Sequence, residues 1–93
     1  MSVRRWRIRG EVQGVGFRWF AQRAARATGV ASGVGGVRNE DDSSVCAVAE
    51  GGTEALDRLG AELARGPRHG RVAEVECEDL AAVPAGERFD LEF

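Results

Sequence analysis

The chain changes from strand to helix within residues 3–18, VRRWRIRGEVQGVGFR, and this change fixes the start of the fold. In its first part, apolar side chains and Gly10 alternate with charged ones. A period of two predicts a strand over residues 3–12 with one buried face. The run Gly14-Val15-Gly16 then predicts a tight turn directly after the strand.

Helical spacing begins at Phe17 and continues to about Ala27. Alanine and arginine, which dominate this segment, both favour helices. Thr28-Gly29 predicts the helix end. One apolar stripe at helical spacing runs through Phe17, Phe20 or Ala21, Ala24, and Ala25 or Thr28.

Beyond residue 28 the pattern predicts four further strands and one further helix. The glycine-rich segment 29–36 is expected to be a mobile loop, and the leucines after Thr53 have helical spacing. The predicted strands cover residues 34–39, 45–50, 73–78 and 89–93, and the predicted helix covers residues 53–65. The order β-α-β-β-α-β plus a terminal strand predicts an α+β, ferredoxin-like two-layer sandwich, with two helices on one face of an antiparallel sheet.

Length and composition predict one domain spanning residues 1–93. The hydrophobic fraction of 43% is enough for one modest core. The sequence contains no run of about 18 apolar residues, which is the length that a membrane-spanning helix needs. The arginine-rich N-terminus lacks the apolar segment of a signal peptide. We therefore expect a cytoplasmic protein with no membrane partner.

The charges are divided unevenly along the chain. All 13 basic residues are arginine, which excludes Schiff-base chemistry and a Walker-type lysine. Residues 1–39 hold eight arginines and one acid, a net charge of +7, whereas residues 40–93 hold five arginines and fourteen acids, a net charge of −9. The basic part favours an anionic ligand unless strands from both parts interleave. The overall acidity argues against nucleic-acid binding.

The remaining polar candidates are expected to be structural. Cys46 and Cys77 lack metal-ligand spacing, and His69 is the single histidine, so we expect two buried thiols and no metal site. Trp6 is expected in the core. The glutamates at positions 74, 76 and 78 line one strand face, opposite the arginines at positions 5, 7 and 9 if the two strands are neighbours.

The segment that carries chemistry is residues 10–18, GEVQGVGFR, because a glycine turn here leads into a helix. Backbone N–H groups at such a turn have no helical partner and favour an anion, and glycines allow close approach. Arg18 can bind two phosphate oxygens at once. The alternative is an ordinary strand–helix connection with a solvated arginine.

The same segment resembles the signature of the acylphosphatase family, G-x-V-Q-G-V-x-[FY]-R, at every fixed position. The run Gly36-Val37-Arg38-Asn39 is similar to the family's second motif, glycine-aromatic-valine-basic-asparagine. The resemblance covers essentially the whole chain and implies the ferredoxin-like fold already predicted from periodicity.

By this resemblance, Arg18 binds the phosphoryl group and Asn39 holds the attacking water through its side-chain amide. The binding loop comprises Gln13, Gly14, Val15, Gly16, Phe17 and Arg18. The resemblance implies an acylphosphatase that cleaves the carboxyl–phosphate bond of small acyl phosphates without metal or cofactor. We expect the chain to be a monomer.

The sequence departs from the family pattern at three places that all affect the strand carrying Asn39. Gly36 replaces the aromatic residue of the second motif, Ser43 replaces a glycine of the hairpin turn, and segment 29–36 is a few residues longer. These departures leave open a non-catalytic anion-binding module. Two further alternatives are a piece of a larger protein, such as a hydrogenase-maturation protein, and an RNA-binding sheet, which lacks the aromatic pair it needs.

Overall fold

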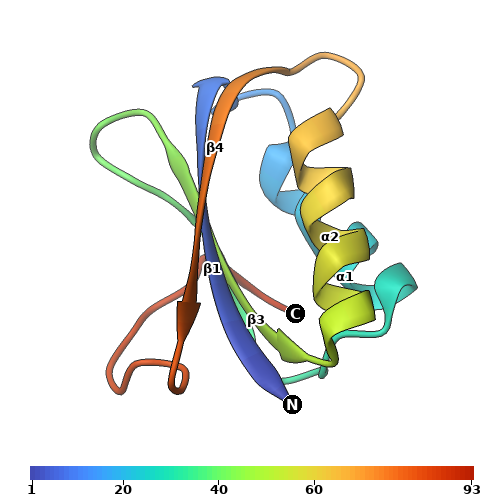
Figure 1. The fold of residues 1–93 in the computed structure, drawn as a ribbon. Coiled ribbons are helices and arrows are strands. Elements are labelled where there is room, and N and C mark those ends of the chain that lie inside the picture. Colours follow the sequence, from blue (N-terminus) through green and yellow to red (C-terminus); the bar gives the residue numbers. More distant parts are fainter.

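The predicted alternation of strands and helices is confirmed in the computed structural model, which describes residues 1–93 (Figure 1). The strands are β1 (Ser2–Glu11), β2 (Gly35–Asn39), β3 (Val45–Gly51), β4 (Arg71–Leu80) and β5 (Leu91–Glu92), and the helices are α1 (Phe17–Thr28) and α2 (Thr53–Arg65). The strands form one antiparallel sheet in the order β4-β1-β3-β2-β5. Both helices cover one face of it, so the ferredoxin-like two-layer sandwich is confirmed.

Element lengths differ from the predicted ones mainly in the last third of the chain. Strand β4 extends beyond residues 73–78 at both ends because β1 pairs with it along nearly its whole length, with a bulge between Arg9 and Gly10. The last strand is only two residues long, since β5 pairs with β2 only at Gly36 and Val37. Neither helix is long and apolar enough to cross a membrane.

The main core lies between the sheet and the two helices. Trp6 and Ile8 of β1 point into it and are almost fully buried, as their period of two predicts. Burial of a large apolar side chain contributes about 1.5–3 kcal/mol, so this face supplies most of the stability. The helices contribute Phe17, Ala21 and Ala25 from α1 and Leu56, Leu59 and Leu63 from α2.

A second, smaller apolar cluster lies on the sheet face opposite the helices. Its buried members are Val3, Cys46 and Val48. The segment joining β4 to β5, residues 81–90, passes over this face (Figure 1) and packs Val83 and Phe89 against the cluster. The sheet is therefore covered on both sides near β2 and β3, which sequence periodicity alone did not indicate.

Gly36 stands where the acylphosphatase pattern has an aromatic residue, and the side chain of Phe89 occupies the space beside it. A Cβ atom at Gly36 would lie 2.4 Å from the Leu91 carbonyl oxygen and 2.7 Å from the Phe89 Cβ. The Arg38 guanidinium lies 5.7 Å from the centre of the Phe89 ring, within cation–π range. An aromatic ring thus covers β2, but it comes from the 81–90 segment.

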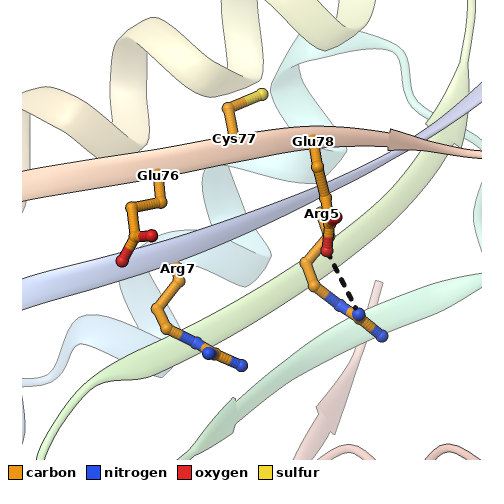
Figure 2. Close-up of a pocket in the computed structure, with 5 residues that line it drawn as sticks. All are labelled: Arg5, Arg7, Glu76, Cys77 and Glu78. Carbon is orange, nitrogen blue, oxygen red and sulfur yellow. Dashed lines mark hydrogen bonds and ion pairs between the residues drawn. The ribbon is translucent and has the colours of Figure 1, made fainter.

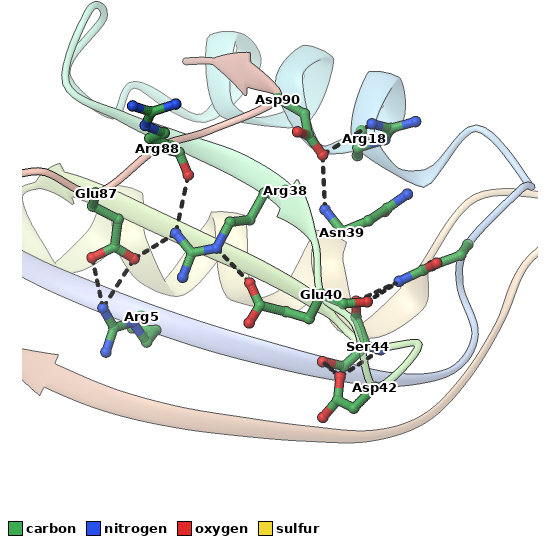
Figure 3. Close-up of polar contacts among 11 residues, drawn as sticks. Arg5, Arg18, Arg38, Asn39, Glu40, Asp42, Ser44, Glu87, Arg88 and Asp90 are labelled. Atoms are coloured by element: carbon green, nitrogen blue, oxygen red, sulfur yellow. Dashed lines mark hydrogen bonds and ion pairs between the residues drawn. The ribbon is translucent and has the colours of Figure 1, made fainter.

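The carboxylate of Glu87 fastens the 81–90 segment to the sheet (Figure 3). Arg5 of β1 donates from Nη2 to both carboxylate oxygens, at 3.0 and 2.8 Å, and Arg38 of β2 donates from Nη1 at 2.7 Å. The Glu87 side chain is only 7% exposed. Burial raises its pKa, but the bonds from Arg38 and Arg5 outweigh burial, so the pKa of Glu87 lies below its usual value.

The predicted placement of arginines opposite glutamates across the sheet is confirmed, and two of the three arginines form ion pairs there. Strand β1 sets Arg5, Arg7 and Arg9 opposite Glu78, Glu76 and Glu74 of β4, respectively. Arg5 forms an ion pair with Glu78, and Arg9 forms ion pairs with Glu74 and Glu76, whereas Arg7 forms none. These contacts are exposed, so each contributes little to the free energy of unfolding.

The expectation of two buried thiols is wrong for one cysteine. Cys46 is buried in β3, but Cys77 is exposed on β4. The reason is the position of β4 at the edge of the sheet, which the alternation within residues 73–78 did not reveal.

Replacing Ser43 with glycine is expected to stabilise the protein by about 0.5–1 kcal/mol. Ser43 has a φ of +76°, a left-handed conformation that costs a residue with a Cβ atom. Urea unfolding measures the change. Ser32→Gly is the control, because Ser32 lies in a turn without positive φ and its replacement should destabilise slightly. Equal effects of the two substitutions would contradict strain at Ser43.

Replacing Glu87 with glutamine is expected to destabilise the protein by about 1–2 kcal/mol at pH 7, since two arginines lose a buried anionic partner. A carboxylate with a lowered pKa in the folded state stabilises above its unfolded pKa, and this contribution is lost as pH falls. The difference in free energy of unfolding between wild type and Glu87→Gln should therefore shrink below about pH 4.5.

Denaturant titrations between pH 3 and pH 7 measure this gap. Glu78→Gln removes an exposed partner of the same Arg5 and should have a much smaller effect at every pH. A Glu87→Gln gap independent of pH would show that the carboxylate charge is not what fastens the segment.

Candidate functional site

The turn between β1 and α1 presents unpaired backbone donors. Gly14 and Gly16 both have positive φ values, +76° and +79°, which turn the chain into the helix. Among the hydrogen bonds outside helices and strands, none is donated by a backbone N–H of residues 13–19. Helix α1 has no side-chain N-cap and no acid in its first turn. Its N-terminus therefore offers free N–H groups and a partial positive charge to an anion.

Arg18 lies in the first turn of α1, directly beside these donors. Its side chain is 42% exposed, and Nη1 donates a hydrogen bond of 3.0 Å to Oδ2 of Asp90. This is the single hydrogen bond that its guanidinium makes within the chain. A guanidinium has five N–H donors, so most of them remain available for a ligand.

Asn39, at the end of β2, lies on the other side of Asp90. Its backbone N–H donates to the same Oδ2 of Asp90 at 2.9 Å. Its side-chain amide makes no hydrogen bond within the chain, and Figure 3 shows it extending toward the side on which Arg18 lies. The structure thus brings together the two residues that the sequence predicts as phosphate-binding and water-holding.

Asp90 is the residue of this group that the sequence did not predict. It lies 72 positions from Arg18, and no motif or spacing connects the two. The hydrogen bond from the backbone N–H of Asn39 has the largest effect and lowers the pKa of Asp90; burial opposes it, and the bond from Arg18 lowers the pKa further, so the pKa lies below its usual value. Its carboxylate is therefore ionised at neutral pH.

Gln13 begins the predicted binding loop, but its side chain has a different task. The side-chain amide nitrogen donates to the carbonyl oxygens of Glu40 at 2.8 Å and Ser44 at 2.9 Å. These carbonyls flank the turn of the β2–β3 hairpin, so Gln13 ties the β1–α1 turn to the strand that ends in Asn39. The side-chain amide has no donor left for a ligand.

Two other residues of the predicted loop have side chains that pack into the protein. Phe17 is buried in the core and contacts Phe20 edge to face, with ring centres 5.7 Å apart. Val15 is half-buried and packs against the core. These side chains fix the start of α1, whose preceding N–H groups make no hydrogen bond within the chain.

Elsewhere the chain has no metal-ligand cluster and one hollow. No group of three or more His, Cys, Asp and Glu side chains is arranged to hold a metal ion. A hollow of about 300 Å³ opens on the sheet face away from the helices, lined by Arg5, Arg7, Glu76, Cys77 and Glu78 (Figure 2). It contains none of the loop residues, and its charges largely neutralise one another.

Comparisons with known proteins agree on one family. The acylphosphatase family profile matches residues 4–91. The chain is 48% identical over 80 residues to an acylphosphatase of Koribacter versatilis, covering 86% of this chain and 70% of that protein. It is 48% identical over 83 residues to one of Salinibacter ruber, covering 89% and 84%. The crystal structure of a Bacillus subtilis acylphosphatase matches with a TM-score of 0.82 at 31% identity, covering 96% of each chain.

Replacing Gln13 with alanine is expected to destabilise the protein by about 1–3 kcal/mol, because two carbonyls in a partly buried turn lose their donor. Chemical denaturation measures the loss. Gln22→Ala is a matched control, since Gln22 makes one exposed hydrogen bond to the Glu92 carbonyl and its loss should cost under about 1 kcal/mol. Equal losses for both variants would show that Gln13 does not tie the hairpin.

Proposed function

This chain belongs to the acylphosphatase family, and from that premise we propose that Arg18, Asn39 and the backbone of residues 13–18 hydrolyse its substrate. The activity is that of an acylphosphatase: the carboxyl–phosphate bond of a small acyl phosphate is cleaved to a carboxylate and inorganic phosphate. One observation carries the assignment. The Arg18 guanidinium and the backbone N–H of Asn39 both donate to the same oxygen of Asp90, beside the unpaired backbone N–H groups of the β1–α1 turn.

The phosphoryl group lies at the start of α1 in this proposal. Its oxygens accept hydrogen bonds from the N–H groups of Val15 to Arg18 and from the free donors of the Arg18 guanidinium. Since these donors are fixed before substrate arrives, they stabilise the charge that develops on the phosphoryl oxygens without reorganising.

The attacking water is held by the side-chain amide of Asn39. Water attacks phosphorus, the bond between phosphorus and the acyl oxygen breaks, and the electron pair leaves with the carboxylate. A carboxylate is stable at neutral pH, so the leaving group needs no general acid. The water's proton goes to a phosphate oxygen of the substrate. Positioning and electrostatics then supply the catalysis, with no metal or cofactor in any step.

A non-catalytic binding module was the main alternative from the sequence. It rested on the weak second motif, where Gly36, Ser43 and the longer segment 29–36 could loosen the strand that presents Asn39. Phe89 packs over Gly36, and β5 pairs with β2 on its outer edge. These contacts hold the strand in place and favour the enzyme over the binding module.

We further propose a single domain that acts as a monomer in the cytoplasm and binds no nucleic acid. The exposed edge strand β4 carries Glu74, Glu76 and Glu78, whose charges oppose pairing with a second copy of this edge. The arginines of the sheet face are largely paired with acids, which lowers the positive charge that this face offers to a phosphate backbone.

The purified chain is expected to hydrolyse benzoyl phosphate in the presence of EDTA. Arg18→Ala should lower kcat/KM by about 10³-fold, since a charge-stabilising group is lost. Asn39→Ala should lower kcat by about 10²-fold, because the water is no longer positioned. Release of benzoate measures both effects.

Arg23→Ala is the control for loss of one arginine from α1, because Arg23 is exposed and forms no ion pair; it should retain full activity. Full activity of Arg18→Ala would refute the site assignment. Absence of hydrolysis by the wild-type chain, with phosphate still binding at Arg18, would instead support the binding module.

A further inference from the structure

One carboxylate oxygen connects the two groups of the proposed site. Oδ2 of Asp90 accepts from Nη1 of Arg18 at 3.0 Å and from the backbone N–H of Asn39 at 2.9 Å (Figure 3). Because both donors share one acceptor atom, the guanidinium and the end of β2 are held within two hydrogen-bond lengths of each other. No other hydrogen bond joins Arg18 to the rest of the chain through its side chain.

Asp90 is itself held firmly by the backbone around it. Its own N–H donates to the Val37 carbonyl at 2.9 Å, so it is attached to β2 immediately before β5 begins. On one side of it Phe89 packs against Gly36, and on the other Leu91 pairs with Val37. The carboxylate therefore has a fixed position relative to the strand that carries Asn39.

We propose that Asp90 is a positioning residue, which orients the Arg18 guanidinium and the end of β2 for phosphoryl transfer. The inference rests on the proposed function of Arg18 and Asn39. Asp90 touches neither substrate nor water in this arrangement. It occupies one donor of the guanidinium, which leaves the remaining donors for the phosphoryl oxygens.

The same ion pair has a second physical interpretation, in which Asp90 competes with phosphate for Arg18. The two interpretations predict opposite results. A competitor lowers phosphate affinity, so its removal tightens binding and leaves or raises kcat. A positioning residue keeps the guanidinium in the geometry of the transition state, so its removal lowers kcat while a mobile Arg18 still binds phosphate.

The test compares Asp90→Asn with Glu92→Gln in the full chain. Glu92 is a matched control, because it also lies in the last strand region and its carboxylate makes no hydrogen bond or ion pair. We expect Asp90→Asn to lower kcat for benzoyl phosphate about tenfold without raising KM. Its dissociation constant for inorganic phosphate should be unchanged or lower, since a nearby negative charge is removed. Glu92→Gln should leave all three quantities unchanged.

A second variant provides a spectroscopic signal. Asp90→Ala removes the acceptor of the Asn39 N–H entirely, so the amide proton resonance of Asn39 should move upfield while the resonances of α2 stay in place. Loss of kcat in Asp90→Ala together with this local shift supports positioning. Shifts spread over the whole spectrum would show general disruption of the fold and would overturn the positioning role of Asp90.

The outcomes separate this inference from the proposed function. Wild-type turnover that Arg18→Ala abolishes, with Asp90→Asn equal to Glu92→Gln, would overturn the role of Asp90 and leave the function standing. Tighter phosphate binding with unchanged or higher kcat in Asp90→Asn would identify Asp90 as a competitor and likewise overturn it. A wild-type chain without turnover would defeat the proposed function, and the inference would fall with it.

Discussion

The β1–α1 turn must be attached to the β2–β3 hairpin for the site to exist, and the side chain of Gln13 makes that attachment. Its amide nitrogen binds the carbonyl oxygens of Glu40 and Ser44 on either side of the hairpin turn. The turn supplies the free amides and Arg18, while the hairpin supplies Asn39. Neither segment has a functional arrangement alone, because the donors that would bind phosphate come from the β1–α1 turn, whereas the amide that would hold water comes from β2.

The 81–90 segment, which packs on the sheet face opposite the helices, completes this arrangement. Phe89 covers Gly36, Glu87 bonds to Arg5 and Arg38, and Asp90 joins Arg18 to the Asn39 backbone. The segment therefore acts on β2 through packing, through a buried carboxylate and through a shared hydrogen-bond acceptor. The charge asymmetry along the chain has its physical outcome here, since acids of the later half neutralise arginines of the first half.

The fold was largely predictable because its two periodicities are local properties of the sequence. Alternation over residues 3–12 and the leucine spacing of residues 53–65 each bury one face, and burial dominates stability. The length of β4, the two-residue β5 and the exposure of Cys77 were not predictable. Each depends on which strand lies beside another and which strand lies at the edge, and pairing partners leave no periodic mark on the sequence.

The sequence by itself determined the strand–turn–helix element, its glycine turn and the presence of Arg18 beside free amides, since these follow from residues that are neighbours in the chain. It also indicated Asn39 through a motif. Only the tertiary structure decided that Gln13 serves the hairpin, that Phe89 fills the place beside Gly36, and that Asp90 lies between Arg18 and Asn39. These contacts join residues far apart along the chain, and a hydrogen bond or packing contact of that kind exists only once the strands have been brought into register.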